Sequence, residues 1–179
     1  MRQYLRKMLG HTSNPTTVSV ADTFWGWLGA FAGISLVAAV DGRFLGGTDL
    51  LLLIGSFGAS AVLIYGAIES PLAQPRNLVG GHVLSAVVGV TVFQLLPEPA
   101  WLTAGLAVSL AIAVMHVTKT VHPPGGATAL IAVIGSPKIH DLGYHYVFIP
   151  VASGVVILLV VALLVNNVRR GKRYPAFWY

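Results

Sequence analysis

The feature that most constrains this chain is a proline- and glycine-rich run inside its apolar sequence, His-Pro-Pro-Gly-Gly at residues 122–126. The surrounding stretch 120–137 carries no acidic or basic side chain other than His122, so we expect it at membrane depth. Proline lacks an N–H group and biases the residue before it away from helix, so a helix can begin only near Pro124. From Pro124 to Gly135 a helix would be roughly 18 Å long, about half of a ~30 Å hydrocarbon core. The sequence therefore predicts a half-helix whose free N–H groups open at mid-membrane, where they favour an anion.

Composition supports a membrane protein of one domain. Hydrophobic residues make up 55% of the 179 residues and charged residues 9%, whereas soluble domains carry about 25% charged residues. We expect a transmembrane domain at 23–168, between a cytoplasmic segment at 1–22 and a basic cytoplasmic tail at 169–179. The basic start has no apolar run before Phe24, which is unlike a secretory signal. The absence of cysteine excludes disulfides, thiolate metal sites and iron–sulfur clusters.

Six stretches without Asp, Glu, Lys or Arg predict an all-α, polytopic protein of six segments. They are Thr23–Val40, Leu50–Ile68, Asn77–Pro97, Pro99–Thr118, Thr120–Pro137 and Leu142–Val168. The second segment is interrupted by Gly-Ser-Phe-Gly-Ala-Ser at 55–60, and the fifth by the run at 122–126. We therefore expect broken half-helices in segments 2 and 5.

Basic residues at both chain ends predict that both termini are cytoplasmic, which requires an even number of crossings. With six crossings, Arg76 and Lys119 also fall on the cytoplasmic side, and only Arg43 and Lys138 lie outside. The expected location is the inner (plasma) membrane. Four crossings are the alternative, with the fifth segment as a re-entrant loop.

A weak internal repeat favours six segments. Residues 58–64, Gly-Ala-Ser-Ala-Val-Leu-Ile, align with residues 126–132, Gly-Ala-Thr-Ala-Leu-Ile-Ala. Each match falls in the middle segment of a three-segment half, and three crossings per half place the second copy upside down, as in inverted-repeat transporters. The alternative is a chance match, because small-residue runs are common in membrane helices.

The two helix breaks together predict an anion site. We expect half-helices to begin near Gly58 and Gly126, with N-termini facing each other across the midplane and small residues permitting close backbone approach. Hydroxyl and imidazole groups at the breaks would add donors. The candidate substrate-binding residues are Ser56, Phe57, Gly58, Ala59, Ser60, His82, His122, Pro123, Pro124, Gly125, Gly126, Ala127 and Thr128. The alternative is that proline and glycine only kink two packed helices.

Arg76, Asn77 and Lys119 form a candidate cationic vestibule that would raise the anion concentration at the inner mouth. The alternative for Arg76 and Asn77 is a cytoplasmic anchor followed by a Gly-Gly packing contact.

Metal, cofactor and enzyme functions are not expected. No two of the six histidines have the i, i+4 or carboxylate-backed spacing of a zinc or di-iron helix. Serine-hydrolase, P-loop and dinucleotide-binding signatures are absent. The basic residues cluster at the chain ends, where they indicate topology and not nucleic-acid binding.

Three ordered motifs resemble the HPP family of integral membrane proteins. They are the His-Pro-Pro-Gly-Gly-Ala-Thr-Ala run at 122–129, the 55–60 run, and Pro-Arg-Asn-Leu-Val-Gly-Gly-His at 75–82. The resemblance extends over about 24–168. Members from cyanobacteria and plastids are nitrite transporters, so the resemblance implies nitrite or a similar anion. Families of this kind are often described with four spans, against the six predicted from the charges.

The expected function is therefore a transporter or channel for a small monovalent inorganic anion, with nitrite as the first choice and the lipid bilayer as surroundings. Two alternatives belong to other classes: a histidine-dependent redox, haem or metal protein, and a membrane scaffold or sensor that transports nothing. The sequence leaves open the exact anion, the choice between channel and proton-coupled carrier, and whether the chain forms a homo-oligomer.

Overall fold

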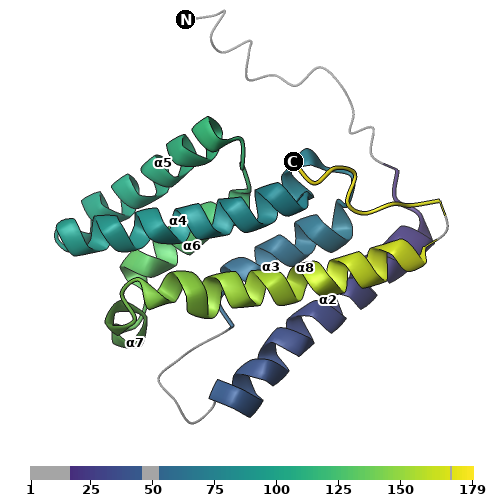
Figure 1. The fold of residues 1–179 in the computed structure, drawn as a ribbon, viewed down its shortest axis with the longest axis horizontal. Coiled ribbons are helices and arrows are strands. Elements are labelled where there is room, and N and C mark those ends of the chain that lie inside the picture. The colour runs from purple at the N-terminus through teal and green to yellow at the C-terminus, as the bar shows by residue number, and fades with distance from the viewer. Residues whose placement is uncertain (1–16, 46–52, 170) are drawn as a thin grey trace, which may run out of the picture.

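The computed structural model describes residues 17–45, 53–169 and 171–179, and within these the regular structure is helical (Figure 1). The all-α prediction is confirmed. Most of the expected N-terminal segment 1–22 lies outside the described residues. The α-helices are α2 (Val20–Val40), α3 (Ser56–Ala61), α4 (Pro75–Leu95), α5 (Ala100–Thr118), α6 (Pro123–Ile134), α7 (Pro137–Asp141) and α8 (Ser153–Val168). Four shorter helical turns are η1 (Asp41–Leu45), η2 (Val62–Gly66), η3 (Pro71–Ala73) and η4 (Val147–Ala152).

Four helices in the described part of the chain are long and apolar enough to cross a membrane. They comprise Val20–Arg43, Pro75–Leu95, Ala100–Thr118 and Val147–Val168, with 19 to 24 residues each. Two apolar helices are shorter, Ser56–Gly66 and Pro123–Ile134. These two fall in the second and fifth predicted segments, where the sequence predicted half-helices.

The start of α6 follows from its prolines. His122 is extended, with φ −139° and ψ 102°, and Pro123 and Pro124 occupy the first two helical positions. At these positions an N–H group would have no acceptor within the helix, so proline loses no helical hydrogen bond there. The helix ends at Ile134 after 12 residues, one residue earlier at each end than predicted. The first half-helix begins at Ser56, two residues before the predicted Gly58.

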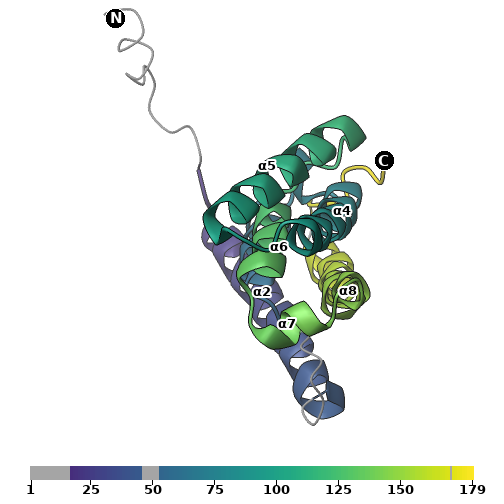
Figure 2. The same ribbon diagram turned by 90° about the vertical axis from the view of Figure 1, so that its left-hand side faces the viewer.

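Helices α4 and α6 run in the same direction and approach closely through small residues. A Cβ atom added at Gly89 would lie 2.6 Å from the carbonyl oxygen of Ala129. One added at Gly125 would lie 2.6 Å from the carbonyl oxygen of Gly81. Lipid provides no hydrophobic driving force for helices to associate. Small residues four positions apart instead let two membrane helices pack closely through their backbones. In Figure 2, α4, α5 and α6 form one group of helices. Helices α2 and α8 lie below this group in the view.

The second helical group holds the shorter helix α3–η2 between α2 and α8. The Tyr65 ring lies against Gly33 of α2, where an added Cβ atom would be 2.2 Å from the phenol oxygen. The Tyr65 hydroxyl donates to the carbonyl of Leu158 on α8 at 3.0 Å. Further along, the Asn166 amide donates to the carbonyl of Ile64 at 2.9 Å. Helix α3–η2 therefore runs beside α8 much as α6 runs beside α4.

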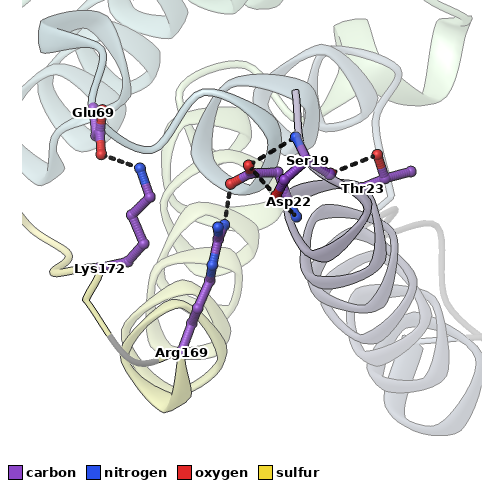
Figure 3. A network of polar contacts seen from close by, with 6 residues as sticks. All are labelled: Ser19, Asp22, Thr23, Glu69, Arg169 and Lys172. Carbon is purple, nitrogen blue, oxygen red and sulfur yellow. Dashed lines mark hydrogen bonds and ion pairs between the residues drawn. The ribbon is translucent and has the colours of Figure 1, made fainter. Parts of the chain in front are cut away.

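Two ion pairs mark one end of the bundle, which we call the ion-pair end (Figure 3). Arg169 pairs with Asp22, and Lys172 pairs with Glu69. Ser19 caps α2 at the same place by accepting from the Asp22 backbone N–H at 3.0 Å. The start of α2, the residues after η2 and the end of α8 thus meet here. They line a cavity of about 300 Å³.

The opposite end, which we call the far end, brings together the end of α4 and the residues around α7. The hydroxyls of Thr91 and Tyr144 lie 2.9 Å apart. The ring of His140 stacks on Phe93 with 4.0 Å between centroids. Because α6 leads directly into α7, the C-terminal end of α6 belongs to the far end.

Candidate functional site

Five buried polar side chains meet where α3, α4 and α6 come together. Ser56 and Ser60 come from α3, His82 from α4, His122 from the residue before α6, and Thr128 from α6. Ser56 is 1% exposed, and the other four are fully buried. We call these five residues the histidine–hydroxyl cluster.

Ser60 joins the two histidines. Its Oγ lies 2.6 Å from Nε2 of His82 and 2.9 Å from Nε2 of His122. The centroids of the two imidazole rings are 4.9 Å apart. One hydroxyl therefore bridges two rings that are close enough for the charge on one to act strongly on the other.

The remaining ring nitrogens also have partners. Nδ1 of His82 lies 2.6 Å from Oγ1 of Thr128, which in turn lies 2.9 Å from Oγ of Ser56. Nδ1 of His122 lies 2.8 Å from the carbonyl oxygen of Leu72. All four imidazole nitrogens are thus hydrogen-bonded. In the described part of the chain no three His, Asp or Glu side chains are grouped as a metal site.

The position of His122 depends on α4. Asn77 of α4 donates from its side-chain amide to the carbonyl of Val121 at 2.8 Å. A Cβ atom on Gly81 would lie 2.4 Å from Cβ of His122, so the extended backbone at His122 lies directly on the helix surface. A glycine is needed there because any side chain would push His122 away from Ser60.

The first turns of α3 and α6 overlap side by side in opposite chain directions. Ser56, at the start of α3, contacts Thr128 in the second turn of α6, whereas Ser60 contacts His122 just before α6. This differs from the predicted arrangement, in which the two N-termini face each other end to end. Their contact is made by side chains.

Backbone N–H groups at these helix starts are partly used. The N–H of Phe57 donates to Ile54 at 3.0 Å and that of Gly58 to Gly55 at 3.2 Å. In α6 the N–H of Gly125 donates to His122 at 2.8 Å, and the two prolines have none. Donors for a ligand therefore come chiefly from imidazole and hydroxyl groups, and less from the backbone than the sequence suggested.

The other candidate residues divide into two sets. Phe57, Pro124 and Gly125 are buried beside the cluster, and the Phe57 ring meets His82 edge-on at 5.7 Å. Gly58, Ala59 and Pro123 are exposed on the bundle surface.

Gly126 and Ala127 lie on the other side of α6, facing an apolar pocket of about 460 Å³ between α5 and α6. A Cβ atom on Gly58 would meet nothing within 4 Å, and one on Gly126 only Val108 at 3.8 Å. Of the small residues expected to permit close backbone approach, Gly125 is the one that packs against a neighbouring backbone, whereas Gly58 and Gly126 have space beside them.

The three vestibule residues gather near the start of α4 and the end of α5. The Arg76 guanidinium donates to the carbonyl of Thr118 at 2.8 Å, which stabilises the C-terminus of α5. Lys119 follows in the left-handed conformation with φ 57° and is exposed. Arg76 therefore lies close to Lys119 in the folded protein. Asn77 holds the residues that lead to His122.

Sequence reasoning missed three contributors. Ser85, one turn after His82, is fully buried and its hydroxyl is the one buried side-chain oxygen without a partner in the described residues. Tyr146 is also fully buried and donates to the carbonyl of Thr128 at 3.0 Å. The backbone of Leu72 has no signal in the sequence, whereas the i, i+3 spacing of His82 and Ser85 could have been noticed.

Comparison with known proteins now places the chain. The family model described as the HPP transmembrane region matches residues 15–175. The chain belongs to the HPP family. The HPP motifs at 55–60, 75–82 and 122–129 are therefore the segments that build the histidine–hydroxyl cluster. No solved structure matches the HPP protein described here.

Two relatives of this HPP protein come from Dictyostelium discoideum, and each is named only as a transmembrane protein. One is 46% identical over 180 residues, which cover 99% of this chain and 58% of the relative. The other is 43% identical over 182 residues, covering 99% of this chain and 64% of the relative. The chain thus spans about three fifths of the length of these relatives. The family and the apolar helices establish a multi-pass membrane protein.

Proposed function

We propose that this HPP protein moves a small monovalent inorganic anion, nitrite in the first place, through a site at the histidine–hydroxyl cluster. The observation that carries the proposal is a buried group of imidazole and hydroxyl groups where two short helices lie side by side. Helices α3, α6 and α8 contain no acidic or basic residue, so no carboxylate repels an anion there. A buried anion is tolerated only where such donors surround it.

Ser85 supports the same location. Its hydroxyl has no partner, and a Cβ atom on Gly125 would lie 2.9 Å from its Oγ. A buried donor without an acceptor is costly unless a ligand or water satisfies it. In the proposed site the hydroxyl of Ser85 donates to the bound anion.

We further propose six crossings, with the two short helices completing the second and fifth. Glu69, just beyond α3–η2, reaches the ion-pair end, and Thr118, just before the extended residues leading to α6, is held near the start of α4. The far end receives the close of α6. This path returns the chain to the ion-pair end after six passages, and the basic residues near the termini favour the cytoplasm for that end.

The proposed inverted repeat gains support from the cluster itself. Aligning residues 58–64 with 126–132 makes Ser60 equivalent to Thr128. These two hydroxyls contact the two nitrogens of one ring, Nε2 and Nδ1 of His82, at 2.6 Å each. Each short helix also runs beside the last long helix of the other half, as inverted repeats that exchange their central elements would.

Anion flux into proteoliposomes tests the function. Nitrite, nitrate, formate and chloride are compared for the wild type, His122→Ala and the matched control His116→Ala, which changes an exposed histidine on α5. We expect nitrite flux to fall at least tenfold in His122→Ala, to be unchanged in His116→Ala, and to recover partly in His122→Gln. All variants should elute as monodisperse protein in detergent.

Wild-type flux equal to that of empty liposomes would refute transport and favour a scaffold or sensor. A visible absorption band or stoichiometric metal in the purified protein would favour the redox class instead. Unchanged flux in a well-folded His122→Ala variant would move the site away from the cluster.

A further inference from the structure

The hydrogen bonds of the cluster have a fixed order, which begins at Leu72. A carbonyl oxygen only accepts, so Nδ1 of His122, 2.8 Å away, carries a proton. A neutral imidazole has one N–H group, so Nε2 of His122 accepts from Ser60 at 2.9 Å. The tautomer of His122 therefore follows from its backbone partner.

The same reasoning continues across Ser60 to the second histidine. The hydroxyl of Ser60 has one proton, which it donates to His122, so its 2.6 Å contact with His82 requires Nε2 of His82 to donate. Nδ1 of His82 must then accept from Thr128 at 2.6 Å. With both rings neutral, every proton from Thr128 to Leu72 points the same way.

We propose that this series of hydrogen bonds holds a single mobile proton, which passes between His82 and His122 through Ser60. We further propose that this proton accompanies the transported anion. A proton taken from hydronium in the external solution, which leaves water behind, forms an N–H bond at Nδ1 of His82 and makes that ring an imidazolium. The N–H bond at Nε2 of His82 then breaks as an O–H bond forms at Ser60, while the former O–H bond of Ser60 breaks and an N–H bond forms at Nε2 of His122. His82 is left neutral, and His122 carries the charge.

Reversal of the hydrogen bonds accompanies the transfer. Nδ1 of His82 keeps its new proton and donates it to Thr128, which turns its own proton towards Ser56 at 2.9 Å or the carbonyl of Pro124 at 3.4 Å. The donors on His82, Ser60 and His122 each retain an acceptor in both states. The relay therefore needs no large movement of any side chain.

The histidine pair accommodates one added proton and not two. The ring centroids lie 4.9 Å apart, and two imidazolium charges at that separation in a buried site repel strongly. Single protonation thus leaves one ring neutral, and that ring acts as the acceptor at the other side of Ser60.

The surroundings of the pair explain why proton and anion travel together. Helices α3, α6 and α8 and the turn η3 contain no Asp, Glu, Lys or Arg. Tyr146 reaches the carbonyl of Thr128, while on α4 Arg76 is held by the carbonyl of Thr118. Lys119 is exposed. A lone imidazolium or a lone anion would be costly here, but each offsets the charge of the other. The expected ratio is one proton per anion, with no net charge moved.

The anion coupling rests on the proposed function, whereas the order of the protons does not, so two measurements separate them. Nitrogen-15 NMR of histidine-labelled protein in lipid nanodiscs tests the relay. At neutral pH we expect His122 protonated at Nδ1 and His82 at Nε2, and on acidification a single proton shared by the pair. In Ser60→Ala the exchange of that proton should be lost, while Thr103→Ala, another buried hydroxyl far from the pair, should behave as wild type. The opposite tautomers, or two protons taken up together, would overturn the relay.

Flux measurements test the coupling. Nitrite uptake into proteoliposomes should acidify the lumen by one proton per nitrite, as read by a trapped pH dye, and should not respond to a potassium diffusion potential. Ser60→Ala should lose the increase of uptake on external acidification, and Thr103→Ala should keep it. Uptake driven by the potential without acidification would refute the coupling even if the NMR result stands. Absence of any flux would refute the proposed function and the coupling together, leaving the relay to be judged by NMR alone.

Discussion

Adjacent glycines in α6 provide a matched test of the close approach between α4 and α6. In Gly125→Ala the new Cβ atom would lie 2.6 Å from the carbonyl oxygen of Gly81, whereas in Gly126→Ala the nearest atom is 3.8 Å away on Val108. An ordinary contact begins near 3.4 Å. The Gly125→Ala variant therefore requires α4 and α6 to separate by about 0.8 Å at this point.

The magnitude follows from comparing the two variants. Overpacking of this kind costs about 1–3 kcal/mol, and replacing a helical glycine by alanine gains about 1 kcal/mol at either position. Because both variants share the gain, their difference in stability isolates the packing cost. At about 2–4 °C per kcal/mol for a chain of this size, a difference of about 2 kcal/mol lowers the melting temperature of Gly125→Ala by about 4–8 °C relative to Gly126→Ala.

The assay is thermal denaturation in detergent followed by size-exclusion chromatography with tryptophan fluorescence, since the chain has no cysteine for thiol-reactive dyes. Gly126→Ala should match or exceed the wild type. Because Gly125 and Gly81 position His122 beside Ser60, Gly125→Ala should also reduce nitrite flux in proteoliposomes. Equal melting temperatures for the two variants would refute the close approach of α4 and α6.

Two further predictions concern topology and the second helical group. Single cysteines introduced at Asp41, Glu98 and Lys138 should react with a membrane-impermeant maleimide from outside intact cells; labelling at Lys138 only after permeabilisation would show that the fifth segment does not cross. Tyr65→Phe should lower stability by about 1 kcal/mol, because the buried Leu158 carbonyl loses its donor, and its melting temperature measured as above should fall; a melting temperature equal to that of the wild type would contradict this contact.

The sequence predicted those elements that depend on local chemistry. Charge-free runs located the four long helices, because an uninterrupted apolar stretch of about 20 residues has few other stable forms in lipid. The two prolines located the start of α6 to within one residue, since proline acts on its own backbone and that of its predecessor. Ser60, His82, His122 and Thr128 were predicted as site residues because their hydroxyl and imidazole groups are possible donors at or near the two helix breaks.

The sequence did not predict how each helix is rotated about its axis. Helices such as α5 and α8 are apolar on every side, so periodicity gives little indication of which face is buried. Gly125 and Gly126 illustrate this, because one touches α4 and the other faces a pocket, although their sequence contexts are alike. Ser60 contacts His82, which is 22 positions away in the sequence, and His122, which is 62 positions away. Such long-range contacts cannot be recognised from a single sequence.

The cluster lies on the boundary between the two helical groups, and this has a mechanical consequence. Ser56 and Ser60 belong to the group of α2, α3 and α8, whereas His82, His122 and Thr128 belong to the group of α4, α5 and α6. A rocking motion of one group against the other would withdraw Ser60 from both imidazoles at once, while Asn77 keeps the residues before His122 fixed on α4. In the proposed transport, opening the molecule to either side would then interrupt proton transfer in the same movement that exposes the anion, so that neither ion would cross alone.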